Sequence, residues 1–140
     1  MSDLATNLNE SQTREVRSRP VVMIVDDSQT IRRSAELFLK DLDYEVVLVE
    51  NGFDALGEIY TKKPDLIFMD LMLPKLGGYE TCQVVKQNPE FSHIPIIFLS
   101  SKDSVFDKAK GRMSGADDYL TKPFTKSLLV DTVKKFLEQK

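Results

Sequence analysis

Five polar side chains could do chemistry together, because each closely follows a short apolar run of the sequence: Asp26, Asp27, Asp70, Ser100 and Lys122. Two carboxylates about 4 Å apart repel each other by about 4 kcal/mol at an effective dielectric constant of ~20, and a third adds to the repulsion. One lysine offsets part of it. A hard divalent cation such as Mg²⁺ offsets more, because it binds carboxylates, waters and phosphate oxygens together. This group of residues therefore predicts a site for Mg²⁺ and a phosphoryl group.

Among the three carboxylates, Asp70 is the candidate nucleophile. A carboxylate can attack a phosphoryl group in line and form an aspartyl phosphate, while a metal ion and Lys122 neutralise the phosphoryl oxygens. Taken singly, Asp27 and Ser100 can also be helix caps, and Lys122 can be a solvated side chain. Asp70 does not fit the capping role, because the "LMLP" that follows it at 71–74 does not look like the start of a helix.

Five apolar runs must supply the strands that position these residues. They are "VVMIV" at 21–25, "EVVLV" at 45–49, "DLIFM" at 65–69, "PIIFL" at 95–99 and "DYL" at 118–120. The first four are nearly continuous, which is typical of strands buried on both faces of a sheet. Helical patterns separate the runs, so we predict a (βα)₅ α/β fold with a parallel sheet and helices on both sides. The pattern does not give the strand order, but the carboxyl ends of parallel strands meet at one edge.

Helix start signals follow each run. The predicted helices begin at or near Ser28, Asn51, Gly78, Ser104 and Thr125. Ser, Asn and Thr are favoured capping residues because their side chains accept hydrogen bonds from the first backbone amides of a helix. In the second helix the apolar spacing predicts that Phe53, Leu56 and Tyr60 point inward.

Composition indicates one ordinary globular domain of 140 residues, 41% hydrophobic and 29% charged, with a net charge of −3. This charge gives no attraction for nucleic acid, and the apolar runs are too short to cross a membrane. The N-terminus lacks a signal peptide, so we expect a cytoplasmic protein. Cys82 is the only cysteine, so an internal disulfide is excluded, and we predict that it is a half-buried helix residue. The single histidine excludes a multi-histidine metal site. We expect a flexible tail over 1–20 and the domain over 21–140.

Four motifs together resemble the receiver domain of bacterial two-component response regulators, the CheY-like superfamily. They are "VDD" at 25–27, "MDLMLP" at 69–74, "LSS" at 99–101 and "LTKPF" at 120–124. The resemblance covers roughly residues 20–140, in order and with the right spacing. It implies a flavodoxin-like, doubly wound sheet with strand order 2-1-3-4-5.

The resemblance also implies roles for individual residues. Asp70 is similar to the aspartate that is phosphorylated in the family. Asp26 and Asp27 would bind Mg²⁺ with Asp70 and the backbone carbonyl of Met72, and Lys122 would pair with the phosphoryl group. The bond from Lys122 to the proline that follows would be cis.

A conformational switch is implied by two further matches. Ser100 matches the switch hydroxyl of the family, and Tyr119 matches the switch aromatic. Phosphorylation would draw Ser100 toward the phosphoryl oxygens, and Tyr119 would rotate into the vacated space. The surface made by the fourth helix, the fifth strand and the last helix would then change for partner proteins.

The stretches "GGYETCQVVKQN" and "SSKDSVFDKAKGRMSGADDYLTKPF" look closer still to the stand-alone regulators of chemosensory systems that control type IV pili and twitching motility. The implied partners are a sensor histidine kinase or its phosphotransfer domain and a downstream effector protein. We expect no direct contact with nucleic acid or membrane, and a monomer or a weak dimer on phosphorylation. Nothing follows residue 140 in the sequence, so we expect no fused DNA-binding domain.

Two other functions remain open at the level of the residues. A Mg²⁺-dependent phosphohydrolase with an aspartyl nucleophile needs a second acid, and "MDLM" supplies none two positions after Asp70. A flavodoxin-like cofactor binder needs a phosphate-cradling glycine loop, which we do not find.

Met72 stands two positions after Asp70, where a polar or acidic residue can orient the water that hydrolyses the aspartyl phosphate. Methionine cannot orient this water. We therefore predict slow self-dephosphorylation, and a half-life of seconds for the purified phosphoprotein would contradict it.

Overall fold

The computed structural model describes residues 19–101 and 115–138, and strands alternate with helices along the chain. The strands are β1 (Val21–Val25), β2 (Glu45–Val49), β3 (Leu66–Asp70), β4 (Ile96–Ser101) and β5 (Asp118–Lys122). The helices are α2 (Gln29–Leu39), α3 (Gly52–Lys62), α4 (Gly78–Gln87) and α6 (Lys126–Leu137). The predicted tail up to residue 18 and the helix predicted from Ser104 lie outside the described residues.

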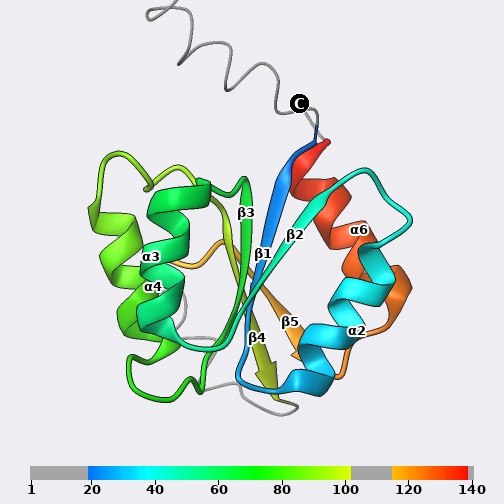
Figure 1. Ribbon diagram of the computed structural model, residues 1–140, viewed down its shortest axis with the longest axis horizontal. Coiled ribbons are helices and arrows are strands. Elements are labelled where there is room, and N and C mark those ends of the chain that lie inside the picture. Colours follow the sequence, from blue (N-terminus) through cyan, green and yellow to red (C-terminus); the bar gives the residue numbers. More distant parts are fainter. Residues whose placement is uncertain (1–18, 102–114, 139–140) are drawn as a thin grey trace, which may run out of the picture.

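The five strands form one parallel sheet in the order β2-β1-β3-β4-β5. Helices α2 and α6 cover one face of this sheet, and α3 and α4 cover the other (Figure 1). This arrangement confirms the predicted α/β, flavodoxin-like, doubly wound fold and the strand order that the resemblance implied. No helix in the described part of the chain is long and apolar enough to cross a membrane.

Successive residues of the central strands enter two different apolar cores. In β1, Met23 lies in the core with α3 and α4, and Ile24 lies in the core with α2 and α6. In β3, Ile67 and Phe68 divide between the two cores in the same way. All residues of β1 and β3 are buried. The nearly continuous apolar runs have this physical origin, because a strand covered on both faces must be apolar at every position.

Strand β2 does not follow the prediction of burial on both faces. Four of its five residues are only half-buried, because β2 is an edge strand of the sheet. The neighbouring helix α3 differs from the prediction for the same reason. Phe53 is 59% exposed and Tyr60 is 67% exposed, so the prediction that both point inward is wrong, while Leu56 does pack against the core.

The predicted caps are confirmed at three helices. The Ser28 hydroxyl accepts a hydrogen bond from the amide of Ile31, and the Asn51 side chain accepts one from the amide of Asp54. Thr125 caps α6 in the same manner. Each cap satisfies an amide that has no partner within its helix. Because each cap follows a strand closely, it also fixes the direction in which the chain leaves the carboxyl edge of the sheet.

Cys82 and Lys122 differ from their predicted surroundings. Cys82 is fully buried in α4 rather than half-buried, and this burial raises the pKa of its thiol to about 11. Lys122 is the last residue of β5 rather than a residue beyond it, because β5 pairs with β4 as far as Ser101. The peptide bond from Lys122 to Pro123 is cis, as the resemblance implied.

Candidate functional site

The parallel sheet brings the predicted site residues to its carboxyl edge. Asp26 directly follows β1, Asp70 ends β3, Ser100 lies in β4 and Lys122 ends β5. The strand register aligns these positions across the sheet, with Asp70 opposite Leu99 and the end of β4 opposite Lys122. Residues that are far apart in the sequence therefore become neighbours because of strand pairing alone.

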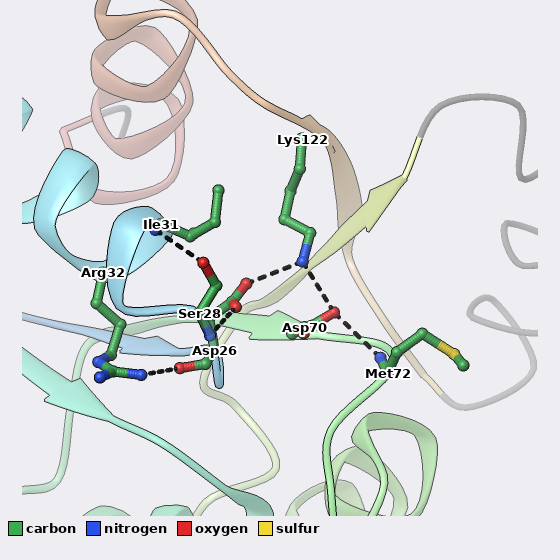
Figure 2. A network of polar contacts seen from close by, with 7 residues as sticks. All are labelled: Asp26, Ser28, Ile31, Arg32, Asp70, Met72 and Lys122. Carbon is green, nitrogen blue, oxygen red and sulfur yellow. Dashed lines mark hydrogen bonds and ion pairs between the residues drawn. The ribbon is translucent and has the colours of Figure 1, made fainter.

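Lys122 joins the two buried carboxylates. Its Nζ lies 3.1 Å from Asp26 Oδ2 and 3.2 Å from Asp70 Oδ1 (Figure 2). Asp26 is 0% exposed and Asp70 is 3% exposed, whereas Lys122 reaches the cluster from a more open position. One ammonium therefore faces two desolvated carboxylates, and this group carries an excess of negative charge.

The pKa of Asp70 reflects this excess. Burial and then the charge of Asp26 raise its pKa, against the opposing effects of the Met72 amide and Lys122. Burial alone would lower the pKa of Lys122, but the charges of Asp26 and Asp70 outweigh burial and raise it. Lys122 is therefore held as a cation, while the two acids compete for it.

Asp27 completes a group of three carboxylates with Asp26 and Asp70. One oxygen from each lies within 4.8 Å of the others, and Asp27 is exposed while the other two are buried. Carboxylate oxygens with an open side toward solvent are the donors that Mg²⁺ takes, together with waters and phosphate oxygens. The donor set and its excess charge therefore fit a hard divalent cation.

Met72 lies beside this group and points away from the core. Its amide donates a hydrogen bond of 3.1 Å to Asp70 Oδ1, and its side chain is 75% exposed (Figure 2). The use of its backbone carbonyl as a metal ligand stays a prediction, and so does slow self-dephosphorylation.

Ser100 carries an unusual hydroxyl. The residue is 2% exposed, and its Oγ has no hydrogen-bond partner among the described residues. A buried polar group without a partner costs about 1–3 kcal/mol, so this hydroxyl needs an explanation. Tyr119 lies on the adjacent strand, opposite Phe98, and is half-buried against the core. The structure therefore places both predicted switch residues on the β4–β5 pair.

Arg32 was missed by the sequence analysis. Its guanidinium donates a hydrogen bond of 2.6 Å to the backbone carbonyl of Asp26 (Figure 2). The guanidinium also lies 3.6 Å from a carboxylate oxygen of Glu50. The amide of Ser28 holds the other side of the same turn, because it donates to Asp26 Oδ1 at 2.8 Å. The sequence "SQTIRR" gives two adjacent arginines and no signal for which one turns toward β1.

Gly78 allows the chain after β3 to return close to Asp70. A Cβ atom at this position would lie 2.3 Å from the carbonyl oxygen of Asp70 and 3.0 Å from the Cα of Leu71. Any larger residue would push α4 away from the end of β3. The glycine is therefore required by close packing against the backbone of Asp70.

The fold is that of a response regulator receiver domain. The family model of the response regulator receiver domain matches residues 22–134, so the chain belongs to this family. Protein PilG of Pseudomonas aeruginosa is 52% identical over 113 residues, which cover 81% of this chain and 84% of PilG. The alkaline phosphatase synthesis transcriptional regulatory protein PhoP of Bacillus subtilis is 40% identical over 118 residues, covering 84% of this chain and 48% of PhoP.

Solved structures agree with this assignment. The chemotaxis response regulator CheY4 of Vibrio cholerae is 31% identical, with a TM-score of 0.80 over 86% of this chain and 100% of CheY4. The receiver domain of the sensor histidine kinase PA1611 from Pseudomonas aeruginosa is 27% identical, with a TM-score of 0.80 over 87% of this chain and 100% of that domain. That structure has a magnesium ion coordinated in its active site cleft.

Proposed function

We propose that this chain is a phosphorylation-dependent signalling switch that accepts a phosphoryl group on Asp70. The observation that carries the proposal is the pairing of a buried Asp70 with Lys122 inside a cluster that has more carboxylates than cations. The donor would be a phosphohistidine of a sensor histidine kinase or of its phosphotransfer domain, which is the general chemistry of two-component systems.

In the transfer step, an Asp70 carboxylate oxygen attacks phosphorus as the bond from phosphorus to the histidine nitrogen of the donor breaks. Lys122 then pairs with a phosphoryl oxygen, since its Nζ already lies 3.2 Å from Asp70 Oδ1. A Mg²⁺ ion held by Asp26, Asp27, Asp70 and the Met72 carbonyl would neutralise charge on the phosphoryl oxygens. Asp26 keeps its hydrogen bond from the amide of Ser28, which fixes its direction throughout the step.

The signal would leave the site through Ser100 and Tyr119. The hydroxyl of Ser100, which has no partner among the residues that the structure describes, would donate to a phosphoryl oxygen, and this removes the cost of leaving it buried and unpaired. Movement of Ser100 would open space for Tyr119 on the adjacent strand β5. The surface of β5 and α6 would then change shape for an effector protein.

We further propose that the pathway controls motility through type IV pili. The support is the 52% identity to PilG and the resemblance of residues 77–88 and 100–124 to stand-alone chemosensory regulators. In this proposal residues 21–140 form the receiver domain, residues 1–20 form a tail, and the protein is a monomer or a weak dimer when phosphorylated.

Incubation with acetyl phosphate and Mg²⁺, followed by intact-mass measurement, tests the transfer. We expect a mass gain of one phosphoryl group in the native protein and none in Asp70→Asn, whose side chain keeps its shape but lacks the nucleophile. An equal gain in both proteins would contradict the assignment of Asp70.

Phosphomonoesters provide a second arm of the same experiment. A switch forms one phosphoryl adduct for each molecule and then stops, whereas a phosphohydrolase releases phosphate continuously. Multiple turnover of a phosphomonoester would therefore favour the enzyme over the switch.

A further inference from the structure

Strand β2 leaves part of its backbone open at the edge of the sheet. The amide of Glu45 donates to the Pro20 carbonyl, and the Val49 carbonyl accepts from the amide of Asp26, so these alternate residues face β1. The backbone groups of Val46 and Leu48 therefore face the other way. Within the described residues β2 pairs only with β1, so no strand meets these groups.

Apart from one charged residue at its start, Glu45, strand β2 carries in its own sequence none of the usual protection against strand pairing. Natural edge strands commonly carry a lysine, a proline or a bulge that prevents another strand from adding. The sequence of β2 is "EVVLV", which contains none of these, and its five residues pair with β1 without interruption. A regular and largely apolar edge of this kind can accept an additional strand.

A groove of about 950 Å³ runs along β2 and the outer face of α3. On the α3 side it is lined by Phe53, Asp54, Gly57, Glu58, Thr61 and Lys62. Phe53, on the α3 side, is 59% exposed, so an aromatic side chain is available to a ligand in this groove.

Gly57 contributes no side chain to the α3 side of this groove. A Cβ atom there would meet nothing within 4 Å, so no packing contact in the described structure requires glycine. Glycine inside a helix is destabilising by about 0.5–1 kcal/mol relative to alanine. The absence of a side chain at this position leaves room beside β2 for the side chains of an added strand.

The groove is acidic. Its lining contains the four carboxylates of Glu45, Glu50, Asp54 and Glu58 against the single ammonium of Lys62. Glu50 has a side chain that is 70% exposed, and Arg32 offsets part of its charge from 3.6 Å. A strand that lies here meets carboxylates from both β2 and α3, so basic side chains would complement it and acidic ones would be repelled.

We propose that the β2–α3 groove binds an extended, lysine- or arginine-rich segment of a partner protein, which adds to β2 as a sixth strand. Backbone hydrogen bonds to Val46 and Leu48 hold the segment, and the acidic lining selects its charge. The interaction is distinct from the proposed phosphorylation of Asp70, because it uses the open edge of β2 and not Asp26, Asp27, Asp70, Ser100 or Lys122. Its link to that site is Glu50, which contacts Arg32.

The test uses a short synthetic peptide in which threonine and valine alternate with lysine, and a matched peptide with glutamate in place of lysine. Amide hydrogen exchange of the full-length protein is followed by NMR at Val46 and Leu48. We expect the lysine peptide to slow exchange at both amides, and the glutamate peptide to bind at least about tenfold more weakly. Absence of protection at these amides, or equal binding of both peptides, would overturn the proposal.

Substitutions at Gly57 provide matched variants. Gly57→Leu fills the groove and should abolish peptide binding, whereas Gly57→Ala adds only a methyl group and should keep it. Both should still be phosphorylated by acetyl phosphate, which shows that they are folded. Peptide binding by Gly57→Leu that equals binding by the native protein would contradict the groove as the site.

Two other occupants give different results in the protein without peptide. Protection of Val46 and Leu48 that grows with protein concentration would indicate a second copy of the chain. Protection that is independent of concentration and is lost in Arg14→Glu/Arg17→Glu would indicate the chain's own N-terminal segment. Either result would overturn a partner protein as the occupant.

Discussion

The amino and carboxyl edges of the sheet differ in how their carboxylates are paired with hydrogen-bond donors and cations. At the amino edge two carboxylates, those of Asp65 and Asp117, are matched by donors. Asp65 Oδ2 accepts a hydrogen bond of 2.7 Å from the amide of Val21, which starts β1. Asp117 Oδ2 accepts one of 2.8 Å from the amide of Ile96, which starts β4, and a second of 3.1 Å from Lys86.

At the carboxyl edge the charges are not matched. Asp26, Asp27 and Asp70 face one another, and Lys122 is the cation that contacts Asp26 and Asp70. The buried hydroxyl of Ser100 has no partner in the described part of the chain. A balanced polar network fixes the strand ends at the amino edge, whereas the carboxyl edge keeps an excess of negative charge that a bound cation would neutralise.

Loss of Lys86 should have the largest effect on stability. Its Nζ donates to the carbonyls of Ser92 and Ile94 as well as to Asp117, and its side chain is mostly buried. Lys86→Met should lower the free energy of unfolding by about 2 kcal/mol, because three acceptors lose a charged donor. Urea unfolding measures this change.

Lys135→Met is the matched control for Lys86→Met. Its ion pair with Asp118 is on the surface, so the loss should stay within about 0.5 kcal/mol. Equal losses in the two variants would show that the amino edge is not a structural network.

Removal of charge at the carboxyl edge should have the opposite sign. Asp70→Asn should raise the free energy of unfolding by about 1 kcal/mol without Mg²⁺, because it removes a buried charge that Asp26 repels. Asp117→Asn should lower it, since that carboxylate is held by two donors. Destabilisation by both substitutions would remove the distinction between the two edges.

The contribution of Tyr44 to stability should change only at high pH. Burial, and then the hydrogen bond and charge of Glu138, raise its pKa from 10.0 to about 12. Because the folded state holds the phenol proton more tightly, this contribution to stability is complete below pH 10 and is lost as the pH rises toward 12. Tyr44→Phe should remove this step from urea midpoints measured across that range.

Tyr60→Phe is the control for Tyr44→Phe, because it removes the same hydroxyl group from an exposed tyrosine on the surface of α3. It should leave the pH dependence of the urea midpoint unchanged. A pH profile of Tyr44→Phe that matches the native profile would contradict the role of the Tyr44–Glu138 contact.

Much of the fold could be predicted from the sequence because its signals are local. The apolar runs predict strands, and Ser28, Asn51 and Thr125 cap helices as their types indicate. The exposure of Phe53 and Tyr60 could not be predicted in this way. Apolar spacing does not say that the neighbouring strand lies at the edge of the sheet, and strand order depends on contacts between distant segments.

The site residues also divide into some that the sequence could predict and some that it could not. The acids and Lys122 could be predicted to meet, because each stands at or near the end of a strand and the carboxyl ends of parallel strands share one edge. The roles of Arg32 and Lys86 could not, since a basic residue on a helix reads as a solvated side chain until its partners are known. Both side chains donate to backbone carbonyls, and since every residue has a backbone carbonyl, the sequence does not indicate which carbonyl will be the partner.

Reduction of the phosphorylated protein with borohydride, followed by peptide mass sequencing, identifies which carboxylate of the site accepts the phosphoryl group. Borohydride converts an aspartyl phosphate to homoserine and leaves free carboxylates unchanged, so the product marks the reactive side chain. We predict homoserine at position 70 alone after treatment with acetyl phosphate and Mg²⁺. Homoserine at position 26 or 27, or no homoserine in a protein that has gained a phosphoryl group, would contradict the account.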